Sequence, residues 1–525
     1  MSTSAHLSAL VDGLATAPSG ADDVTVTGLT LDSRHVRPGD LYVALPGQRA
    51  HGAQFVEAAA TSGAVAVLTD PAGAILVGDR LPVVVSDDPR VAMADLAARF
   101  HHRPSRQVTM IGVTGTNGKT TTTFLLEAAL QAGGRAVGTI GTIGFRLRGE
   151  PVEVNRTTVT TPESIDLQAL LARYVAAGAD AVVMEVSSHA LALERVRAVE
   201  FDVAGFTNLG RDHLDFHPSL EHYFDTKARL FEADRCRHAV VMTTDDHGRE
   251  LARRIQEQGA PTLTRVGTSD SDDVRILVNE PTDDGGTRIV LTGSLGDHDV
   301  TIDLPGAHNG RNAALALAMA AAAGADLESA VAGLAHAQVP GRMQRITLEP
   351  PRPGESGTPT VFVDFAHTPQ AIDEAVAVGA RFARLAVVVG AGGDRDSAKR
   401  PLMGEAAARA ADLVVVTDDN PRTEDPGPIR AAVAEGASRG RAALVQIGDR
   451  AEAIRHALDW AGPDDVVLVL GKGHERGQIV GDTVLPFDDA QVVADVWAQV
   501  LADSAHVLAD SAHMLADPTI PTSGK

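Results

Sequence analysis

Lys119 and Thr120 follow a glycine-containing turn in the stretch VTMIGVTGTNGKTTTT, which spans residues 108–123. An apolar, β-branched segment precedes this turn, and a helix-like run starts at Phe124. In that order, backbone N–H groups surround a phosphate chain, the lysine contacts the outer phosphates and the threonine hydroxyl holds Mg²⁺. Five residues separate Gly112 from Gly118, one more than in the usual motif, so the loop is a variant. A plain glycine turn before a helix is the alternative, but the lysine and threonine favour a nucleoside triphosphate site.

Several potential metal ligands follow this loop. Glu185 ends the apolar run of residues 181–184, and a carboxylate at a strand end beside a phosphate loop can hold Mg²⁺. The segment NLGRDHLDFH at residues 208–217 contains His213, and Lys227 lies ten residues beyond its end. Each residue has an ordinary alternative: a solvated glutamate, a histidine that caps a helix and a lysine that is only a surface charge. The neighbouring phosphate loop favours the metal role for Glu185.

Three polar loops in the last third of the chain form a second constellation. Gly-Asp-Arg-Asp at residues 393–396, Asp-Asn-Pro-Arg at 419–422 and Gly-Lys-Gly-His-Glu at 471–475 each lie at or just beyond the end of a predicted strand. Asn-Pro alone is typical of a turn. Three such loops on one rim of a parallel sheet predict a polar binding site.

The elements that position these residues fall into three segments. At 525 residues the chain exceeds what one core usually supports, so we expect two to four domains. Residues 1–104 contain β-like runs at 24–31, 41–45, 65–68 and 83–86 and one helix at 92–100. Residues 105–341 alternate helices with strands at 108–113, 181–186 and 203–207, and end with an alanine-rich helix after His308 and Asn309. Residues 342–499 alternate again, with strands at 361–365, 385–390, 413–417, 445–448 and 466–470. The predicted fold is α/β, with two doubly wound sheets whose sites lie at the carboxyl ends of the strands.

The composition limits the partners. Hydrophobic residues make up 44% of the chain and aromatic residues 3%, which is typical of a globular protein with cores of Ala, Val and Leu. The net charge of −23 argues against nucleic acid or an anionic membrane as a partner. A single cysteine, Cys236, excludes an internal disulfide and fits a reducing compartment. The N-terminus lacks a basic signal region, and the longest apolar run, residues 313–323, is too short to span a bilayer. We therefore expect a soluble, cytoplasmic protein with no membrane insertion.

The C-terminal tail contains a repeat. VLADSAH at residues 500–506 recurs at 507–513, and MLAD follows. A period of seven with paired apolar positions predicts one amphipathic helical face, although two to three heptads are too few to predict a coiled coil. Residues 500–525 are thus expected to form a helical or disordered extension of low functional weight.

Seven motifs together resemble those of the Mur ligases, which assemble the peptide stem of peptidoglycan. GTNGKTTT, EVSSHAL, NLGRDHLDFH, the downstream lysine, LPGAHNGRN, PGRMQR and DFAHTP occur here in the order of that family. The resemblance extends from about residue 25 to residue 498. It implies a small α/β UDP-binding domain, a central P-loop-type ATPase domain and a C-terminal Rossmann-like domain that binds the incoming amino acid. The partners expected are small-molecule substrates alone, and a monomer is expected.

The resemblance also implies roles for the residues of the central segment. In the family, the lysine that matches Lys227 reacts with CO₂ to form a carbamate, an anionic ligand of the kind that Mg²⁺ prefers. Catalytic roles fall on Lys119, His213 and Lys227, and the metal set is Thr120, Glu185, His213 and carbamylated Lys227. The ATP set is Gly115, Thr116, Asn117, Gly118, Lys119, Thr120, Thr121, Asn309, Asn312, Arg342 and Asp364.

Two further sets are implied for the other substrates. The opening LDSR at residues 31–34 and PGDLYVAL at 38–45 resembles the uridine-binding domain of the third and fourth stem ligases. The UDP-substrate set is Leu31, Ser33, Gln48, Arg49, Ala50, Thr160, Thr161, Ser187 and Arg195. Val159 and Leu193 replace polar contacts found in some members. Asp-Asn-Pro-Arg resembles the motif of members that add meso-diaminopimelate, which gives the set Arg395, Asp419, Asn420, Pro421, Arg422, Gly471 and Glu475. In this set, Arg422 is expected to bind the distal carboxylate of the ligand, and Asn420 and Glu475 the neighbouring ammonium.

The resemblance thus implies an ATP- and Mg²⁺-dependent ligase that joins meso-diaminopimelate to UDP-N-acetylmuramoyl-L-alanyl-D-glutamate through an acyl phosphate. Three alternatives stay open. The same type of ligase could add L-lysine or another diamino acid. A folylpolyglutamate synthetase shares the central core but lacks the uridine-binding opening. A nucleotide-gated binding protein that has lost its chemistry would show decay among Thr120, Glu185, His213 and Lys227, yet all four are present.

Overall fold

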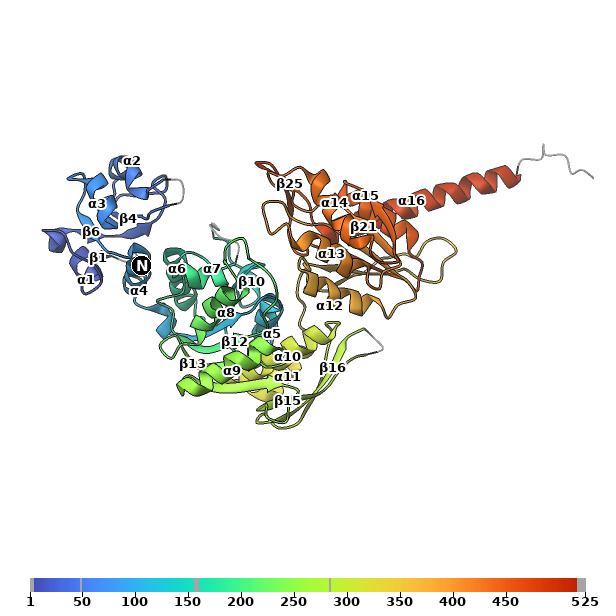
Figure 1. Ribbon diagram of the computed structural model, residues 1–525, viewed down its shortest axis with the longest axis horizontal. Helices are drawn as coiled ribbons and strands as arrows, with labels where there is room; N and C mark the ends of the chain where they lie inside the picture. The colour runs from blue at the N-terminus through green and yellow to red at the C-terminus, as the bar shows by residue number, and fades with distance from the viewer. Residues whose placement is uncertain (1–3, 48–49, 155–159, 283–284, 517–525) are drawn as a thin grey trace, which may run out of the picture.

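The computed structural model describes residues 4–47, 50–154, 160–282 and 285–516. Figure 1 shows three α/β bodies that follow one another along the chain. Each is built on its own sheet, of four, eleven and six strands respectively. The expected boundaries after residues 104 and 341 stay predictions.

The first body is a small parallel sheet in the order β3 (Gly28–Thr30), β4 (Asp40–Ala44), β5 (Ala66–Thr69) and β6 (Val83–Val85). The expected single strand at 24–31 is interrupted, because Thr27 turns its N–H to the carbonyl of Gly39 and β2 (Thr25–Val26) pairs with β1 (Ala5–His6) instead. The expectation of one helix is wrong. Besides α4 (Pro89–Phe100) there are α1 (Leu7–Val11), α2 (Val56–Thr61) and α3 (Pro71–Val77), which are too short to display a helical period.

The central sheet has parallel strands in the middle and antiparallel strands at both edges. Its order is β10-β9-β8-β11-β7-β12-β13-β14-β15-β16-β17, and neighbours from β8 to β15 are parallel. The strands are β7 (Thr109–Thr114), β8 (Val137–Gly141), β9 (Gly144–Leu147), β10 (Glu150–Pro151), β11 (Ala181–Glu185), β12 (Phe201–Phe206), β13 (Cys236–Met242), β14 (Thr262–Gly267), β15 (Val274–Pro281), β16 (Thr287–Gly293) and β17 (His298–Ile302). The doubly wound prediction is confirmed for the middle strands. The sequence patterns did not predict the antiparallel edges, β9–β10 and β16–β17.

Helices cover both faces of this sheet, because successive apolar side chains of its strands point to opposite faces and both must be buried. In β11, Val183 packs in the core under α5 (Lys119–Ala132), α10 (Ala307–Ala322) and α11 (Leu327–Ala335). Its neighbours Val182 and Met184 pack in the opposite core with α6 (Ser164–Ala176) and α7 (Ser188–Ala192). Two more helices, α8 (Leu220–Ala228) and α9 (Asp246–Gln258), complete this second face. Successive side chains of a strand point to opposite faces, so a strand buried on both sides is apolar throughout.

The third body repeats this plan. Its sheet order is β18 (Gln344–Ile346), β19 (Thr360–Asp364), β23 (Val466–Leu470), β20 (Leu385–Val389), β21 (Leu413–Val416) and β22 (Ala443–Gln446), with only β18 antiparallel. One face is covered by α12 (Pro369–Gly379), α13 (Lys399–Ala408) and α14 (Pro426–Ala437). The other is covered by α15 (Arg450–Trp460) and the start of α16 (Asp489–Ala516). A hairpin of β24 (Gly477–Val480) and β25 (Thr483–Pro486) lies beyond β23.

The C-terminal repeat lies in α16, which projects away from the third body in Figure 1. The helix predicted from the heptads is therefore present through Ala516. Its first part is structural: Trp497 and Val500 are buried in the core against α15.

Truncation should separate these two parts of α16. Removal of all residues after Ser504 should leave both ATP turnover and the melting temperature unchanged. Removal after Gln499 also deletes Val500 and the partly buried Leu501, so the free energy of unfolding should fall by roughly 1–3 kcal/mol. Turnover should stay within about twofold in both cases, because chain ends without buried backbone tolerate change. Thermal unfolding and phosphate release measure the two effects. A loss of turnover after removal of the residues beyond Ser504 would contradict the division of α16 into a structural part and a dispensable part.

Candidate active site between the central and C-terminal sheets

A cavity of about 970 Å³ opens between the second and third bodies. The phosphate loop forms part of one wall, and the loops at residues 392–396, 419–422 and 471–475 form part of the other. It brings together most of the predicted ATP, metal and amino-acid residues: Thr116, Asn117, Gly118, Lys119, Thr120, Thr121, Glu185, His213, Lys227, Asn309, Asn312, Arg342, Asp364, Arg395, Asp419, Asn420, Arg422, Gly471 and Glu475. Gly115 and Pro421 belong to the same loops without lining the cavity.

The phosphate loop begins later than its glycine spacing suggested. Gly112 lies inside β7, where a Cβ atom would meet the Phe201 ring at 2.8 Å, so this glycine serves packing rather than the turn. The turn starts at Gly115, whose φ of +143° suits only glycine, and closes at Gly118 with φ of +85°. Helix α5 starts at Lys119. The loop is therefore the short Gly115–Gly118 turn that joins a strand directly to a helix N-terminus.

Lys119 lies folded over this turn. Its ammonium donates hydrogen bonds to the carbonyls of Gly115 at 3.0 Å and Thr116 at 2.9 Å. Burial lowers the pKa of Lys119, while the carboxylates of Glu185 and Asp212 act in the opposite direction. The lysine charge is thus held at the mouth of the loop, where a phosphate chain would meet it.

Thr120 and Glu185 lie together at the ends of adjacent elements. The Thr120 hydroxyl donates to Glu185 Oε1 at 2.9 Å. Thr142, just beyond β8, donates to the same carboxylate through its N–H at 2.8 Å and its hydroxyl at 3.0 Å. Since β7, β8 and β11 are parallel neighbours, their carboxyl ends place these three groups in one spot. No sequence pattern indicated a role for Thr142.

Lys227 is the most deeply placed of the predicted catalytic side chains. It is 1% exposed, and its ammonium donates to the Gly115 carbonyl at 2.8 Å and lies 4.5 Å from the centre of the Tyr223 ring. Burial, together with the nearby Lys119 charge, lowers the pKa of Lys227 well below its usual value. A lowered pKa increases the share of the neutral amine, which is the form that reacts with CO₂.

His213 lies beside this group on the loop after β12. Burial lowers the pKa of His213 to about 3, even though the neighbouring Asp212 carboxylate opposes this shift. Its imidazole is therefore uncharged at neutral pH, as a metal-binding histidine must be. Among the described residues, no three His, Cys, Asp or Glu side chains are grouped so that they could hold a metal ion. A metal here would depend on ligands of other kinds, such as the Thr120 hydroxyl.

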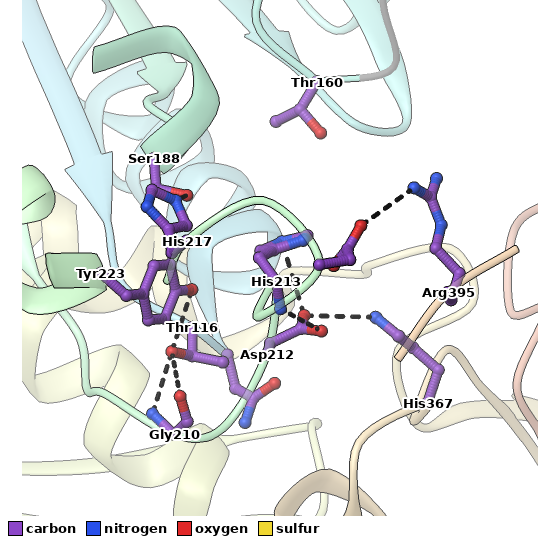
Figure 2. A network of polar contacts seen from close by, with 12 residues as sticks. Thr116, Thr160, Ser188, Gly210, Asp212, His213, His217, Tyr223, His367 and Arg395 are labelled. Carbon is purple, nitrogen blue, oxygen red and sulfur yellow. Dashed lines mark hydrogen bonds and ion pairs between the residues drawn. The ribbon is translucent and has the colours of Figure 1, made fainter. Parts of the chain in front are cut away.

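Asp212 connects the two walls of the cavity (Figure 2). Its carboxylate lies 3.5 Å from His213 Nε2, 3.8 Å from His367 Nε2 and 3.4 Å from Lys399 Nζ. Burial alone would raise the pKa of the Asp212 carboxyl, but the hydrogen bond from His367 and the charge of Lys399 hold this pKa well below its usual value. Sequence reasoning missed Asp212, His367 and Lys399, although the first two belong to motifs that carried the resemblance.

The predicted amino-acid residues lie on the opposite wall. Arg422, with φ of +53°, donates from Nη1 to the Gly393 carbonyl at 2.7 Å. Burial, and then the charge of Arg395, lowers the pKa of Arg422. Arg395 is half exposed and lies 3.9 Å from Asp215 of the central body (Figure 2). Two guanidinium groups in one pocket fit a ligand with two carboxylates.

Asn420 has a different role from the one expected. Its Oδ1 accepts hydrogen bonds from the Lys472 ammonium at 3.1 Å and from the Ile479 N–H at 2.9 Å, and its Nδ2 donates to Glu475 Oε2 at 2.8 Å. Both lone pairs of the amide oxygen are therefore used within the protein. The expectation that Asn420 accepts from a ligand ammonium is corrected, and its second N–H can only donate. Glu475 is the acceptor that remains.

The remaining ATP-side residues lie near the phosphate loop. Asn312 Oδ1 would lie 2.5 Å from a Cβ at Gly118, so only glycine permits this approach. Asn309 and Asn312 come from the N-terminal turns of α10. Arg342 donates to the Thr120 hydroxyl at 3.3 Å, and Asp364 accepts from the N–H of Met343 at 2.6 Å. The Arg342 contact connects the third body to the central one, whereas the Asp364 contact lies within the third body.

The predicted UDP-substrate residues fall into two places. Thr160, Thr161, Ser187 and Arg195 line the cavity. Leu31 and Ser33 follow β3, and Ala50 follows β4, so they lie apart from it at the carboxyl ends of the first sheet. Gln48 and Arg49, like Val159, lie outside the described residues. Leu193 caps α7 and is not among the residues that line the cavity.

Comparison with known proteins identifies the family. The description "Mur ligase family, catalytic domain" matches residues 25–101, "Mur ligase middle domain" matches 113–320, and "Mur ligase, glutamate ligase domain" matches 341–473. The chain belongs to the Mur ligase family.

Relatives of this Mur ligase cover almost its whole length. It is 44% identical to the UDP-N-acetylmuramoyl-L-alanyl-D-glutamate–2,6-diaminopimelate ligase of Corynebacterium efficiens, over 92% of each chain. The protein of the same name from Caldanaerobacter subterraneus subsp. tengcongensis is 39% identical, over 93% of this chain and 98% of that one. A solved ligase of that name superposes with a TM-score of 0.66 at 31% identity, covering 95% of this chain and 99% of that chain.

More distant solved structures share the fold alone. MurF from Acinetobacter baumannii superposes with a TM-score of 0.62 at 20% identity and covers 95% of this chain. A folylpolyglutamate synthase of Mycobacterium tuberculosis superposes with a TM-score of 0.60 at 21% identity and covers 78%. Within the described part of the chain, no helix has the length and apolar character needed to cross a bilayer.

Proposed function

We propose that this Mur ligase joins meso-diaminopimelate to the D-glutamyl γ-carboxylate of UDP-N-acetylmuramoyl-L-alanyl-D-glutamate with cleavage of ATP to ADP and phosphate. The observation that carries this proposal is the single cavity in which the phosphate loop faces Arg395, Arg422 and Glu475. The names of the relatives at 39–44% identity support the substrates. A folylpolyglutamate synthetase activity is disfavoured, because the family match of residues 25–101 covers the opening that such enzymes lack.

The reaction proceeds in two steps. The γ-carboxylate attacks the terminal phosphate of ATP, which gives an acyl phosphate and ADP. The amine of diaminopimelate then attacks the acyl carbon, and phosphate leaves as the amide forms. Both steps depend mainly on positioning and on stabilising negative charge, and Lys119 and the loop N–H groups provide that charge stabilisation for the phosphates.

The residues present fit Mg²⁺ and a carbamate on Lys227. Thr120 and Glu185 supply hard oxygen ligands within 2.9 Å of each other, and His213 is uncharged in the same cavity. Lys227 has the lowered pKa that makes its amine available to CO₂. When bound, Mg²⁺ would neutralise charge on the phosphates of ATP. We further propose that the first body binds the uridine diphosphate end through Leu31, Ser33, Gln48, Arg49 and Ala50, and that the enzyme is a cytoplasmic monomer.

A ligation assay tests the proposed function directly. UDP-N-acetylmuramoyl-L-alanyl-D-glutamate and ATP are incubated with meso-diaminopimelate, L-lysine, L-ornithine or no amino acid, and tripeptide product and phosphate are both measured. Product with diaminopimelate alone is expected. Equal use of L-lysine would overturn the amino-acid assignment, and a relative at 43% identity, from Leifsonia xyli, is named only as a UDP-N-acetylmuramyl-tripeptide synthetase. No phosphate release with any amino acid would favour a binding protein without chemistry.

Replacement of Lys119 by alanine should abolish turnover and leave the fold intact. Among the described residues, the ammonium hydrogen-bonds to the loop carbonyls of Gly115 and Thr116, so no core is disturbed, but the transferring phosphate loses a positive charge at the loop. Loss of such a contact should lower kcat on the order of 10²-fold or more. Phosphate release and thermal unfolding measure the two effects. A variant that releases phosphate at a near-normal rate would refute the phosphate role of Lys119.

A further inference from the structure

Lys472 is a buried lysine that the proposed reaction does not use. It is 0% exposed and follows Gly471 at the end of β23. Lys472 does not line the cavity, whereas its neighbours Gly471 and Glu475 do. A buried ammonium group is costly unless all of its donors are paired, so its partners indicate what it does.

All three hydrogens of this ammonium have partners. Lys472 Nζ donates to Asn420 Oδ1 at 3.1 Å, to Glu475 Oε2 at 3.1 Å and to the Gly477 carbonyl at 2.7 Å. Asp419 Oδ1 lies 3.8 Å away. These partners come from the loop after β21, the loop after β23 and the first residue of β24. Lys472 therefore ties the loop after β21 to the continuous stretch that runs from the end of β23 into β24.

Two of these partners, Asn420 and Glu475, line the cavity and belong to the predicted amino-acid site. Asn420 and Glu475 also hydrogen-bond to each other at 2.8 Å, so the ammonium holds a pair whose geometry is already coupled. The Ile479 N–H donates to the Asn420 oxygen, and the Ile479 carbonyl accepts a hydrogen bond from the Arg422 N–H at 3.0 Å. Arg422, Asn420 and Glu475 are thus fixed relative to one another through contacts that converge near Lys472.

The charge of Lys472 also affects which ligand fits. Asp419 and Glu475 place two carboxylates on the cavity wall, and among the described residues Lys472 is the one cation within 4 Å of both. Without it, the pocket would become more negative. A more negative pocket favours a bare ammonium, as in lysine, and disfavours the additional carboxylate of diaminopimelate.

We propose that Lys472 is a positioning residue for amino-acid selection: it fixes Asn420 and Glu475 and balances their charge so that the pocket accepts a zwitterionic side-chain end. This inference rests on the proposed function, because it assumes that the pocket binds the amino acid. Lys472 touches no substrate and acts only through Asn420 and Glu475.

Steady-state ligation by the full-length chain tests this role. Lys472→Met keeps the length of the side chain and removes its charge and donors. The KM for meso-diaminopimelate should rise about tenfold or more, since a hydrogen bond to a charged group is lost at each of two site residues. The KM values for ATP and for the UDP-linked dipeptide should stay within about twofold, and the advantage of diaminopimelate over L-lysine should narrow. Lys472→Arg, which keeps the charge, should retain more of that advantage.

Two matched variants separate positioning from general stability. Arg352→Met removes another half-buried cation of the third body, one that donates to the Leu458 and Ala461 carbonyls away from the cavity, and should leave every KM unchanged. The effects of Lys472→Met and Glu475→Gln on the KM for diaminopimelate should be less than additive, because one acts through the other.

The possible outcomes are distinct. An unchanged KM and an unchanged selectivity in a folded Lys472→Met variant overturn the inference. If Lys472→Met does not fold, Lys472→Gln replaces it, and failure of both to fold shows a purely structural lysine and also overturns the inference. If the wild-type enzyme prefers a different amino acid, the proposed substrate is wrong, and the same KM comparison with that amino acid still decides the role of Lys472.

Discussion

Replacing Arg422 by alanine should lower kcat/KM for meso-diaminopimelate and remove most of the preference for it over L-lysine. The two amino acids differ by a carboxylate on the distal carbon, and the Arg422 guanidinium offers a planar pair of donors for it. Nη1 donates to the Gly393 carbonyl, which fixes the direction of the group and leaves other donors for a ligand. Lysine would leave this half-buried guanidinium without its carboxylate, and a site built around a required polar group discriminates by roughly 10³-fold or more.

The measurement is kcat/KM for both amino acids with wild type and Arg422→Ala. Arg422→Ala should leave ATP binding unaffected, so the KM for ATP serves as an internal reference. Arg439→Ala removes a half-exposed arginine of the same body that pairs with Glu435 and Glu405, and should change nothing. Arg395→Ala should harm both amino acids, because we assign this residue to the carboxylate next to the attacking amine. If Arg422→Ala keeps the wild-type selectivity, the carboxylate is bound elsewhere.

Replacing Lys227 by alanine should lower turnover strongly, and small carboxylates should partly restore this turnover. In Lys227→Ala the carbamate cannot form, and we expect kcat to fall on the order of 10²-fold or more. Added formate or acetate can enter the space left by the side chain and supply an anionic oxygen. Lys227→Arg should not restore activity, because a guanidinium stays positive and does not take up CO₂.

Two controls accompany this prediction. Thermal unfolding of Lys227→Ala tests whether loss of the 2.8 Å bond to the Gly115 carbonyl disturbs the loop itself. Chloride at the same ionic strength tests whether any rescue requires a carboxylate. Full activity of either Lys227 variant in CO₂-depleted buffer would refute the carbamate, whereas inactivity without rescue by any carboxylate would indicate that the lysine acts as an amine.

The phosphate loop was predictable because its parts are neighbours in the chain. A strand, a glycine turn and a helix N-terminus within residues 109–120 bring Lys119 and Thr120 to one point without help from distant segments. Even so, the spacing misplaced the first glycine. Gly112 and Gly115 look alike in the sequence, and only the Phe201 ring against one and the positive φ of the other distinguish them.

The position of the second constellation also followed from the sequence. Parallel strands end at the same edge of their sheet, so loops after β20, β21 and β23 had to meet, and the predicted polar rim is the wall of the cavity. The alternation of strands and helices along the sequence did not predict the short helices of the first body or the antiparallel strands at the edges of the central sheet. These elements have too few residues, or too mixed a hydrophobic pattern, to show a helical or strand period in the sequence.

The sequence by itself thus determined the α/β class, the phosphate loop and the edge of each sheet at which chemistry takes place. Only the tertiary structure decided which side chains pair there. Asp212 contacts Lys399 across 187 residues, and Lys472 takes the lone pair of Asn420 that had been assigned to a ligand. The physical reason is that periodicity reports which face of an element is buried, whereas hydrogen-bond partners depend on which distant element covers that face.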